Sequence, residues 1–265
     1  MNIKEEVDKI QEEGYSQANA QAKFCQDMIL DLISKSSLNR NVTIKGGVVM
    51  RSISADVRRA TQDIDIDFIR YSLEENSIKA FVDKLNIAGD VTIKMVGNIE
   101  ELRQQDYNGK RIYIEISDEY GTNLLSKIDL GVHKRLEIVQ EEYCFDIEFN
   151  NEGASLLINS KEQMLTEKLR SILKFGSYST RFKDVYDIYY LLNLADKDKL
   201  AHCFEQYIYK DKGMRENTIG DIRKRVNKTL NDKDYTKRLD TSKKNWLDIS
   251  NDEVIYGIEK KLLEL

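Results

Sequence analysis

The sequence predicts an α+β fold, with strands and helices mixed over residues 1–155 and helices alone over 156–265. Apolar side chains alternate with polar ones over 64–68 and 112–116, which is the spacing of a strand with one buried face. From Ser160 onward, apolar residues recur at helical spacing instead. We therefore place the boundary between an N-terminal domain and a helical C-terminal domain at this change of pattern.

Each element is expected where its pattern is clearest. The chain should begin with a helix, because apolar residues recur at helical spacing among few helix breakers. The expected helices cover 3–38, 48–54, 73–85, a segment starting at the N-cap Ser160, and 185–194, with amphipathic segments to 265. The expected strands cover 42–45, 64–70, 91–96, 111–116 and 126–133.

The composition is that of a globular protein, since 41% of the 265 residues are hydrophobic and 33% are charged. No apolar run approaches the roughly 18 residues that span a bilayer, and the N-terminus is too polar for a signal peptide. The three cysteines, Cys25, Cys144 and Cys203, lack the spacing of a metal site. We therefore expect a reduced, cytoplasmic protein without a membrane partner.

Charge is unevenly distributed along the chain. Residues 1–150 carry 19 basic and 27 acidic side chains, whereas 151–265 carry 22 and 19. Within the second part, Lys210 to Lys244 holds 12 basic and 6 acidic residues. An acidic site followed by a basic segment suits an enzyme that acts on a polyanion, although charge alone favours a solvated helical surface.

The leading candidate ligands are Asp63 and Asp65, which alternate with isoleucines on an expected strand. Residues two apart on a strand share a face and lie about 6.5–7 Å apart, so their carboxylates can converge on a divalent cation. Asp67 shares this face, but solvent exposure or a salt bridge explains it equally well. A D-x-D pair is weak evidence by itself, because it also occurs at solvated strand ends and in some glycosyltransferases.

Two further features point to a nucleotide. Asp129 lies in an otherwise apolar strand, where an aspartate is unfavourable unless it is paired, bound to metal or facing water at an edge. Lys45-Gly46-Gly47 lies upstream, where glycines let a backbone turn approach a phosphate and a helix start presents N–H groups. Three carboxylates around two Mg²⁺ ions would support attack on the α-phosphate of an NTP.

The C-terminal domain contributes charged candidates of its own. Lys168 and Arg170 could neutralise triphosphate charge, and Asp184 and Asp187 follow on the next expected helix. Taken singly, each of these charges is explained by an ion pair on a helix surface. Neither an H-E-x-x-H nor a G-x-S-x-G motif is present, so hydrolase chemistry has no support.

Four segments in sequence order resemble the AbiEii/AbiGii toxin family of nucleotidyltransferases. They are Lys45-Gly46-Gly47-Val48-Val49-Met50-Arg51, Arg59-Ala60-Thr61-Gln62-Asp63-Ile64-Asp65-Ile66, Glu167-Lys168-Leu169-Arg170 and Lys183-Asp184-Val185-Tyr186-Asp187-Ile188-Tyr189. The resemblance implies a mixed-sheet DNA polymerase β-like nucleotidyltransferase core in 1–155. It also implies the toxin half of a bacterial toxin–antitoxin or phage-defence pair, with a cognate antitoxin.

The resemblance also assigns roles to residues. The nucleotide would be bound by Lys45, Gly46, Gly47, Arg51 and Lys168. The metal ligands would be Asp63, Asp65 and Asp129. The catalytic set would add Lys168 and Asp184 to those three carboxylates.

The chain departs from the family at Val48, where Thr or Ser is common, and at Thr61-Gln62, where Ser-Glu is usual. These changes leave the nucleotide preference open. We expect Mg²⁺-dependent transfer of NMP from an NTP to RNA, with tRNA as the acceptor. The alternatives are transfer to a protein or a small molecule, and a non-catalytic nucleotide-binding module.

Overall fold

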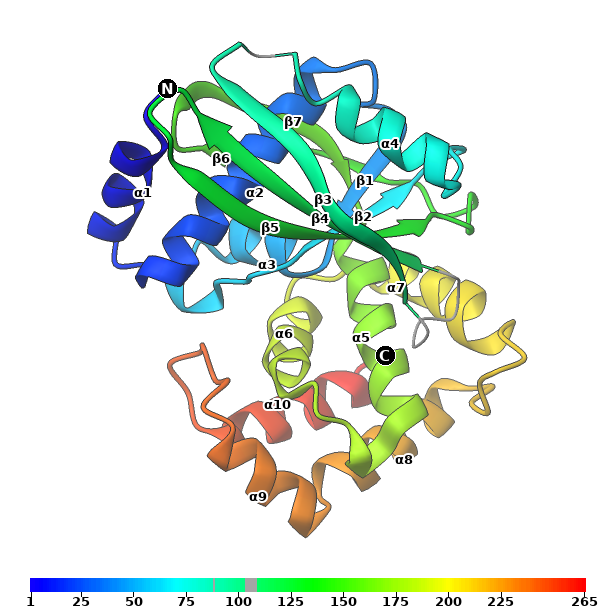
Figure 1. The fold of residues 1–265 in the computed structure, drawn as a ribbon. Helices are drawn as coiled ribbons and strands as arrows, with labels where there is room; N and C mark the ends of the chain where they lie inside the picture. Colours follow the sequence, from blue (N-terminus) through cyan, green and yellow to red (C-terminus); the bar gives the residue numbers. More distant parts are fainter. Residues whose placement is uncertain (88, 103–108) are drawn as a thin grey trace. The chain divides into compact units, whose positions relative to one another are not determined.

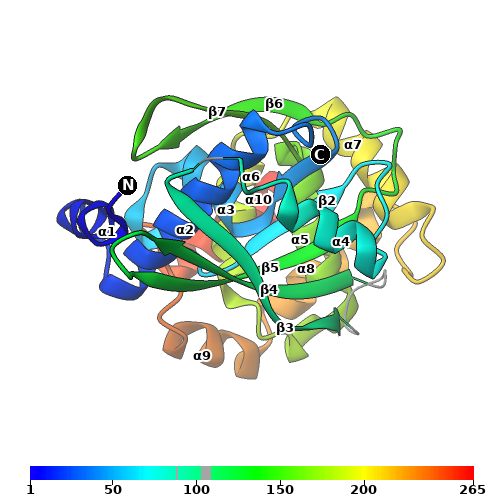
Figure 2. The ribbon, with the colours of Figure 1, turned by 45° about the horizontal axis from the view of Figure 1, so that its top comes forward.

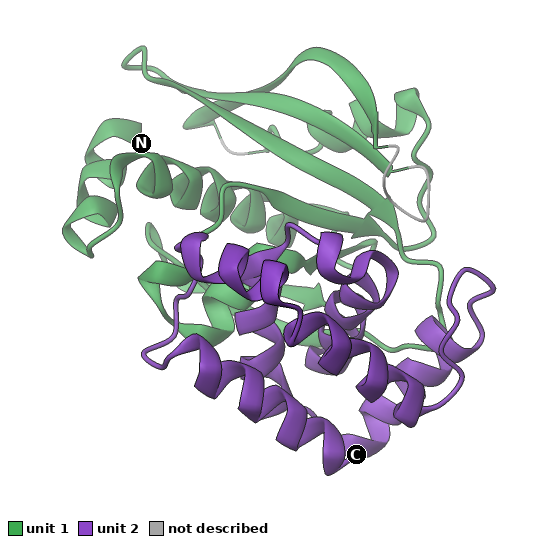
Figure 3. Cartoon of the chain, turned by 90° about the horizontal axis from the view of Figure 1, so that it is seen from below, with its two compact units in different colours: residues 1–159 green, residues 160–265 purple. Residues whose placement is uncertain are grey.

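The computed structural model describes residues 1–87, 89–102 and 109–265. The chain divides into two compact units, Met1–Asn159 and Ser160–Leu265 (Figure 3). The first unit combines a sheet with helices and the second is helical, which confirms the expected α+β fold. No helix in the described part of the chain has the length and apolar character needed to cross a membrane.

The first unit is built on a mixed seven-stranded sheet with strand order β3-β4-β5-β2-β1-β7-β6 (Figure 1). Its strands are β1 Val42–Lys45, β2 Ile64–Phe68, β3 Val91–Leu102, β4 Gly109–Asp118, β5 Asn123–Val132, β6 Glu141–Ile147 and β7 Asn150–Ile158. β2 is antiparallel to β1 and parallel to β5, and β1 is also parallel to β7. β2 is therefore an inner strand with a neighbour on each side.

The register of these inner strands places charged residues side by side. Asp65 pairs with Lys45 on β1 and with Asp129 on β5. Asp129 in turn pairs with Arg111 on β4. Side chains of directly paired residues share a face of the sheet, so these four charges lie in one row across four strands.

The helices of the first unit are α1 Ile3–Glu12, α2 Gln17–Lys35, α3 Gly46–Ser54 and α4 Glu75–Asp83. The single helix expected over 3–38 is thus wrong, because the chain breaks at Gly14, whose φ is +102°. Ser16 then caps α2 by accepting a hydrogen bond from Asn19 N. α4 packs beside the sheet (Figure 2), with the Phe81 ring centroid 5.2 Å from that of Phe68 on β2.

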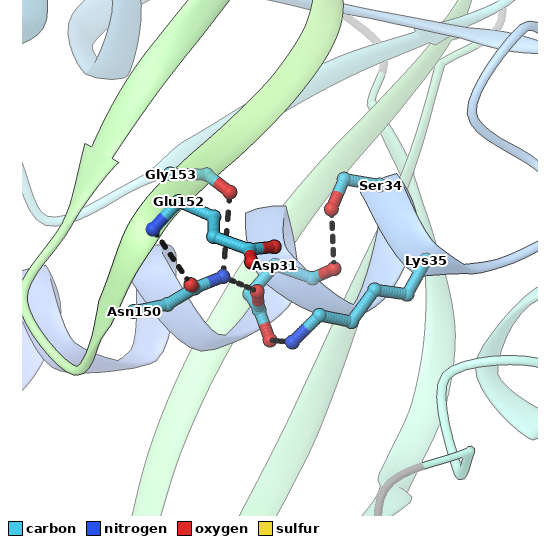
Figure 4. A network of polar contacts seen from close by, with 6 residues as sticks. All are labelled: Asp31, Ser34, Lys35, Asn150, Glu152 and Gly153. Carbon is cyan, nitrogen blue, oxygen red and sulfur yellow. Dashed lines mark hydrogen bonds and ion pairs between the residues drawn. The ribbon is translucent and has the colours of Figure 1, made fainter.

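A buried carboxylate joins α2 to the turn between β6 and β7 (Figure 4). Asp31 accepts hydrogen bonds from Asn150 Nδ2 and Lys35 Nζ, both at 2.7 Å. Asn150 also donates to the carbonyl of Gly153 and accepts from the backbone N–H of Glu152. The sequence analysis did not predict β6 and β7. The hydrogen bond from Asn150 to Asp31 attaches this strand pair to α2, the longest helix of the unit.

The second unit contains the helices α5 Lys161–Phe175, α6 Phe182–Leu192, α7 Lys197–Phe204, α8 Ile219–Leu230, α9 Lys233–Thr241 and α10 Asn251–Leu263. Ser160 caps α5 as expected, since its hydroxyl accepts a hydrogen bond from Gln163 N at 3.1 Å. Short 3₁₀ and π segments, Gly176–Tyr178 and Glu205–Tyr209, follow α5 and α7. The Tyr186 hydroxyl of α6 donates to Asn251 Oδ1 of α10 at 2.8 Å, which joins two helices distant in sequence.

Candidate functional site

The turn from β1 into α3 is shaped by two glycines that leave no room for side chains. Gly46 has a φ of +67°, a region that L-residues rarely adopt. A Cβ on Gly46 would overlap the carboxylate of Asp65, and one on Gly47 would overlap the side chain of Thr61. The backbone at the start of α3 therefore lies directly against the carboxylate of Asp65.

Of the three expected metal ligands, the sheet brings Asp65 and Asp129 into neighbouring positions on β2 and β5. Asp63 lies one residue before β2, on the same side as Asp65 by the alternation of the strand. Its Oδ1 lies 2.9 Å from Lys127 Nζ. That oxygen is buried and accepts no hydrogen bond within the described residues, so the contact is an ion pair without hydrogen-bond geometry.

Asp129 is held by a second basic residue that the sequence did not single out. Arg111 Nε donates to one carboxylate oxygen at 2.7 Å, and Arg111 Nη2 donates to the other at 2.8 Å. The hydrogen bond to Asp129 raises the pKa of Arg111 further above its ordinary value. Lys127 could have been noticed in the sequence, because it lies two residues before Asp129 and so shares its face. Arg111 could not, since only the strand register brings it there.

Lys45 and Asp67 form a further pair on the same face. Lys45 Nζ lies 2.7 Å from Asp67 Oδ1, and Asp67 is only 4% exposed. A salt bridge therefore accounts for Asp67, as the sequence left open. The ion pair between Lys45 and Asp67 therefore adds a side-chain contact between β1 and β2 next to the turn that carries the two glycines.

The donor set fits a hard divalent cation in chemistry, because all three expected ligands are carboxylates. Asp63 Oδ1 is buried, accepts no hydrogen bond within the described residues and faces the Lys127 ammonium, so a metal at this oxygen would take the place of that ammonium. Across 1–87, 89–102 and 109–265, however, no three carboxylate, histidine or cysteine side chains are gathered closely enough to hold a metal. Lys127 and Arg111 are the partners of Asp63 and Asp129 in this arrangement.

Arg51, expected to bind the nucleotide, is buried on α3 and 6% exposed. Its Nη2 donates to Asp27 Oδ1 of α2 at 3.0 Å, and Lys23 Nζ lies 2.7 Å from the other oxygen of Asp27. Arg51 Nη1 is buried without a hydrogen-bond partner in the described residues. The ion pair therefore fixes α3 against α2, while one buried donor remains unused.

In the second unit, Lys168 and Asp184 are in direct contact. Lys168 Nζ lies 2.7 Å from Asp184 Oδ1 and 2.8 Å from Asp187 Oδ2, which places one buried ammonium between two carboxylates. Trp246 Nε1 donates to Asp187 Oδ1 at 3.1 Å. These contacts join α5 and α6 to the segment before α10, and they bring together the residues of the two later motifs.

A tyrosine lies close to this group without a hydrogen bond. The Tyr235 hydroxyl is buried and has no partner in the described part of the chain. Burial, and secondarily the negative charge of Asp184, raise the pKa of Tyr235, so it stays neutral near pH 7.

Known proteins resemble this chain in sequence pattern and in fold. A family model described as nucleotidyl transferase AbiEii toxin, type IV TA system, matches residues 28–253. The fold is similar to that of an antigenic nucleotidyltransferase-like protein from Paracoccidioides brasiliensis, with a TM-score of 0.50 and 17% identity over 83% of this chain and 92% of that chain. It is also similar to the antibiotic-resistance factor ANT(2'')-Ia, with a TM-score of 0.43 and 13% identity over 71% of this chain and 90% of that chain. No curated protein matches the chain.

Proposed function

Because this chain belongs to the AbiEii family of nucleotidyltransferase toxins from type IV toxin–antitoxin systems, we propose that it transfers NMP from an NTP to RNA with the help of Mg²⁺, and that tRNA is the acceptor. The observation that carries the proposal is the contact between the Gly46 turn and the Asp65 carboxylate. This contact places the backbone that we propose to bind phosphate beside the carboxylate that we propose to bind metal, with Asp129 on the neighbouring strand.

Each residue then has a chemical role. The N–H groups at Gly46 and Gly47 bind the triphosphate, and Asp63, Asp65 and Asp129 are the residues that would hold the metal. A bound divalent cation supplies charge stabilisation at the α-phosphate and at the leaving pyrophosphate. The acceptor hydroxyl oxygen bonds to the α-phosphorus and gives its proton to water, while the bond from that phosphorus to the oxygen bridging the α- and β-phosphates breaks and pyrophosphate leaves. Lys168 and Asp184, as residues of the later motifs, are assigned to the same reaction.

The second unit supports an RNA acceptor. None of the 12 basic side chains between Lys210 and Lys244 is buried. Exposed lysines and arginines bind a phosphate backbone by releasing counterions, so binding should weaken steeply as salt concentration rises. The antitoxin partner, a role in phage defence and a cytoplasmic location rest on family membership.

A transfer assay tests the proposal. Purified protein and its Asp65→Ala variant are incubated with Mg²⁺, each α-³²P-labelled NTP and a cell lysate, and the products are separated on a denaturing gel. Asp83→Ala is the matched control, because Asp83 is an exposed aspartate of the same unit outside the site.

We expect a tRNA-sized, RNase-sensitive band from the wild type and from Asp83→Ala, and none from Asp65→Ala. Label on a protein or on a small molecule would show that this molecule, and not RNA, is the acceptor. Undiminished transfer by Asp65→Ala would remove the proposed role of that carboxylate, and no transfer with any NTP would favour a nucleotide-binding module.

A further inference from the structure

Two basic side chains lie on the carboxylate face of the sheet, and nothing in the family motifs accounts for them. Arg111 donates two hydrogen bonds, of 2.7 and 2.8 Å, to the two carboxylate oxygens of Asp129. Lys127 lies 2.9 Å from Asp63. Each cation therefore faces a different one of the three expected metal ligands.

The strand register places both basic residues on the same face as Asp129. Arg111 on β4 is directly opposite Asp129 on β5, and Lys127 lies two residues before Asp129 on the same strand. The Arg111 side chain is 26% exposed and that of Lys127 is 32% exposed. The strand register thus fixes both residues at the backbone, and both side chains are partly exposed.

The proposed function brings a metal ion and a triphosphate to the site, and both interact electrostatically with Arg111 and Lys127. Without a cation, carboxylates on neighbouring strand positions repel one another, and Arg111 and Lys127 offset that repulsion. A divalent cation beside the same carboxylates would repel both side chains, because like charges at such distances interact strongly in a partly buried site. The triphosphate carries negative charge that can accept hydrogen bonds from both of them.

We propose that Arg111 and Lys127 exchange partners during the reaction cycle: they neutralise Asp129 and Asp63 while the site is empty, and they bind the NTP phosphates once a metal engages those carboxylates. This inference rests on the proposed function, and it adds two nucleotide-binding residues to it. It also explains why Asp63 and Asp129 are not gathered around a metal position in the described residues. The ordinary alternative is that both pairs are fixed cross-strand contacts that only stabilise the sheet.

The two explanations differ once the loss of charge is accounted for. Replacing either basic residue by glutamine removes a charge that repels the metal and attracts the NTP, so metal binding tightens and NTP binding weakens in both cases. Arg111→Lys keeps the charge and loses only the paired donors. If the pairs exchange, this variant still binds metal more tightly and NTP more weakly; if the pairs only stabilise the sheet, its metal affinity is unchanged or lower.

The test uses Arg111→Lys, Arg111→Gln and Lys127→Gln in the full chain. Arg40→Gln is the matched control, because it breaks an exposed ion pair with Glu142 at 3.3 Å that includes no residue of the site. Mn²⁺ affinity is measured without nucleotide by EPR of the free ion. Affinity for ATP, GTP, CTP and UTP is measured by equilibrium dialysis with Ca²⁺ in place of Mg²⁺.

We expect each glutamine variant to bind Mn²⁺ about fivefold more tightly, the equivalent of one partly exposed ion pair. Each should bind the preferred NTP about tenfold or more weakly, the equivalent of one hydrogen bond to a charged group. Arg40→Gln should change neither affinity. For Arg111→Lys we expect smaller changes in the same directions.

The outcomes separate this inference from the proposed function. Unchanged or weaker Mn²⁺ binding in folded Arg111→Lys would overturn partner exchange while leaving the transfer activity of the wild type in place. A wild-type protein that binds neither Mn²⁺ nor any NTP would overturn both.

Discussion

Alanine at Gly46 is the smallest change that should separate the fold from the activity. The added methyl group has two consequences at this position. It forces an L-residue into a backbone conformation with φ near +67°, and it places a carbon on the carboxylate of Asp65. The first consequence affects stability, and the second affects the position of the proposed metal ligand.

The size of each effect follows from the structure. An L-residue in the left-handed region loses about 1–2 kcal/mol relative to glycine, so the free energy of unfolding should fall by at least that amount. Asp65 cannot keep its present position, because the new Cβ would overlap its Oδ2. A displacement of about 1 Å at a reacting group can lower a rate about 100-fold, and we expect at least that loss in nucleotide transfer.

The chain offers a control that carries the strain without the overlap. Gly97 on β3 has a φ of +71°, and a Cβ there would meet no atom within 4 Å. Gly97→Ala should therefore lose a similar free energy of unfolding while its transfer rate stays at the wild-type level. Urea unfolding measures the stability of both variants, and the labelled-NTP assay measures their rates.

Two results would refute the reasoning. Transfer at the wild-type rate by folded Gly46→Ala would show that the approach of the turn to Asp65 does not matter for activity. An equal loss of transfer in Gly97→Ala would show that backbone strain, and not the displaced carboxylate, accounts for the effect.

The remaining predictions concern stability. Asp27→Ala should lower the free energy of unfolding by about 3–5 kcal/mol, because it leaves the buried guanidinium of Arg51 without its carboxylate. Urea unfolding checks this, and a loss below about 1 kcal/mol would mean that the pair is not desolvated as its burial indicates. Burial first, and then the neighbouring Glu148, raise the pKa of Glu13 from 4.5 to about 6. Its protonated form is thus favoured in the folded state, so this contribution to stability is present below pH 4.5 and is lost as the pH rises through 6. Glu13→Gln should remove that loss, which solvent screening limits to less than about 1 kcal/mol. If the free energy of unfolding changes by the same amount between pH 4.5 and 7.5 in the wild type and in Glu13→Gln, the prediction is wrong.

Local patterns were sufficient to predict the elements around the site. The alternation of Ile64 and Ile66 with aspartates, and the glycines after Lys45, predicted β2 and the turn into α3. These elements are short, and their residues face one well-defined core. The same information could not show where the long N-terminal helical pattern breaks, because Gly14 looks like one tolerated glycine until its backbone conformation is known.

The strands β6 and β7 were not expected, and the structure gives the physical reason. β6 is an edge strand in which exposed positions alternate with less exposed ones over all of Glu141–Ile147, but Glu141 occupies one of the less exposed positions, which hides the strand pattern in the sequence. β7 pairs with β1, more than a hundred residues earlier in the chain. Such pairing depends on the tertiary arrangement, which a window of neighbouring residues does not contain.

The charges that face Asp63 and Asp129 illustrate the same limit within the site. Arg111 and Asp129 are separated by 18 residues, and their contact follows only from the antiparallel register of β4 and β5. The sequence identified the aspartates because an acidic residue in an apolar strand is unusual. It gave no such signal for Arg111, which lies in a strand that is already part-polar.

The charge balance of the sheet face explains how several carboxylates can lie close together. The charged side chains of this face that contact one another or lie in register include Asp63, Asp65, Asp67, Asp129, Lys45, Arg111, Lys127 and, opposite Arg111 on β3, Glu100. Five negative charges are thus partly offset by three positive ones, and each ion pair joins neighbouring strands or the residue just before one. A metal and a triphosphate bring their own opposite charges to such a surface. Binding therefore rearranges an existing set of ion pairs, so metal and nucleotide should bind more tightly together than either does alone.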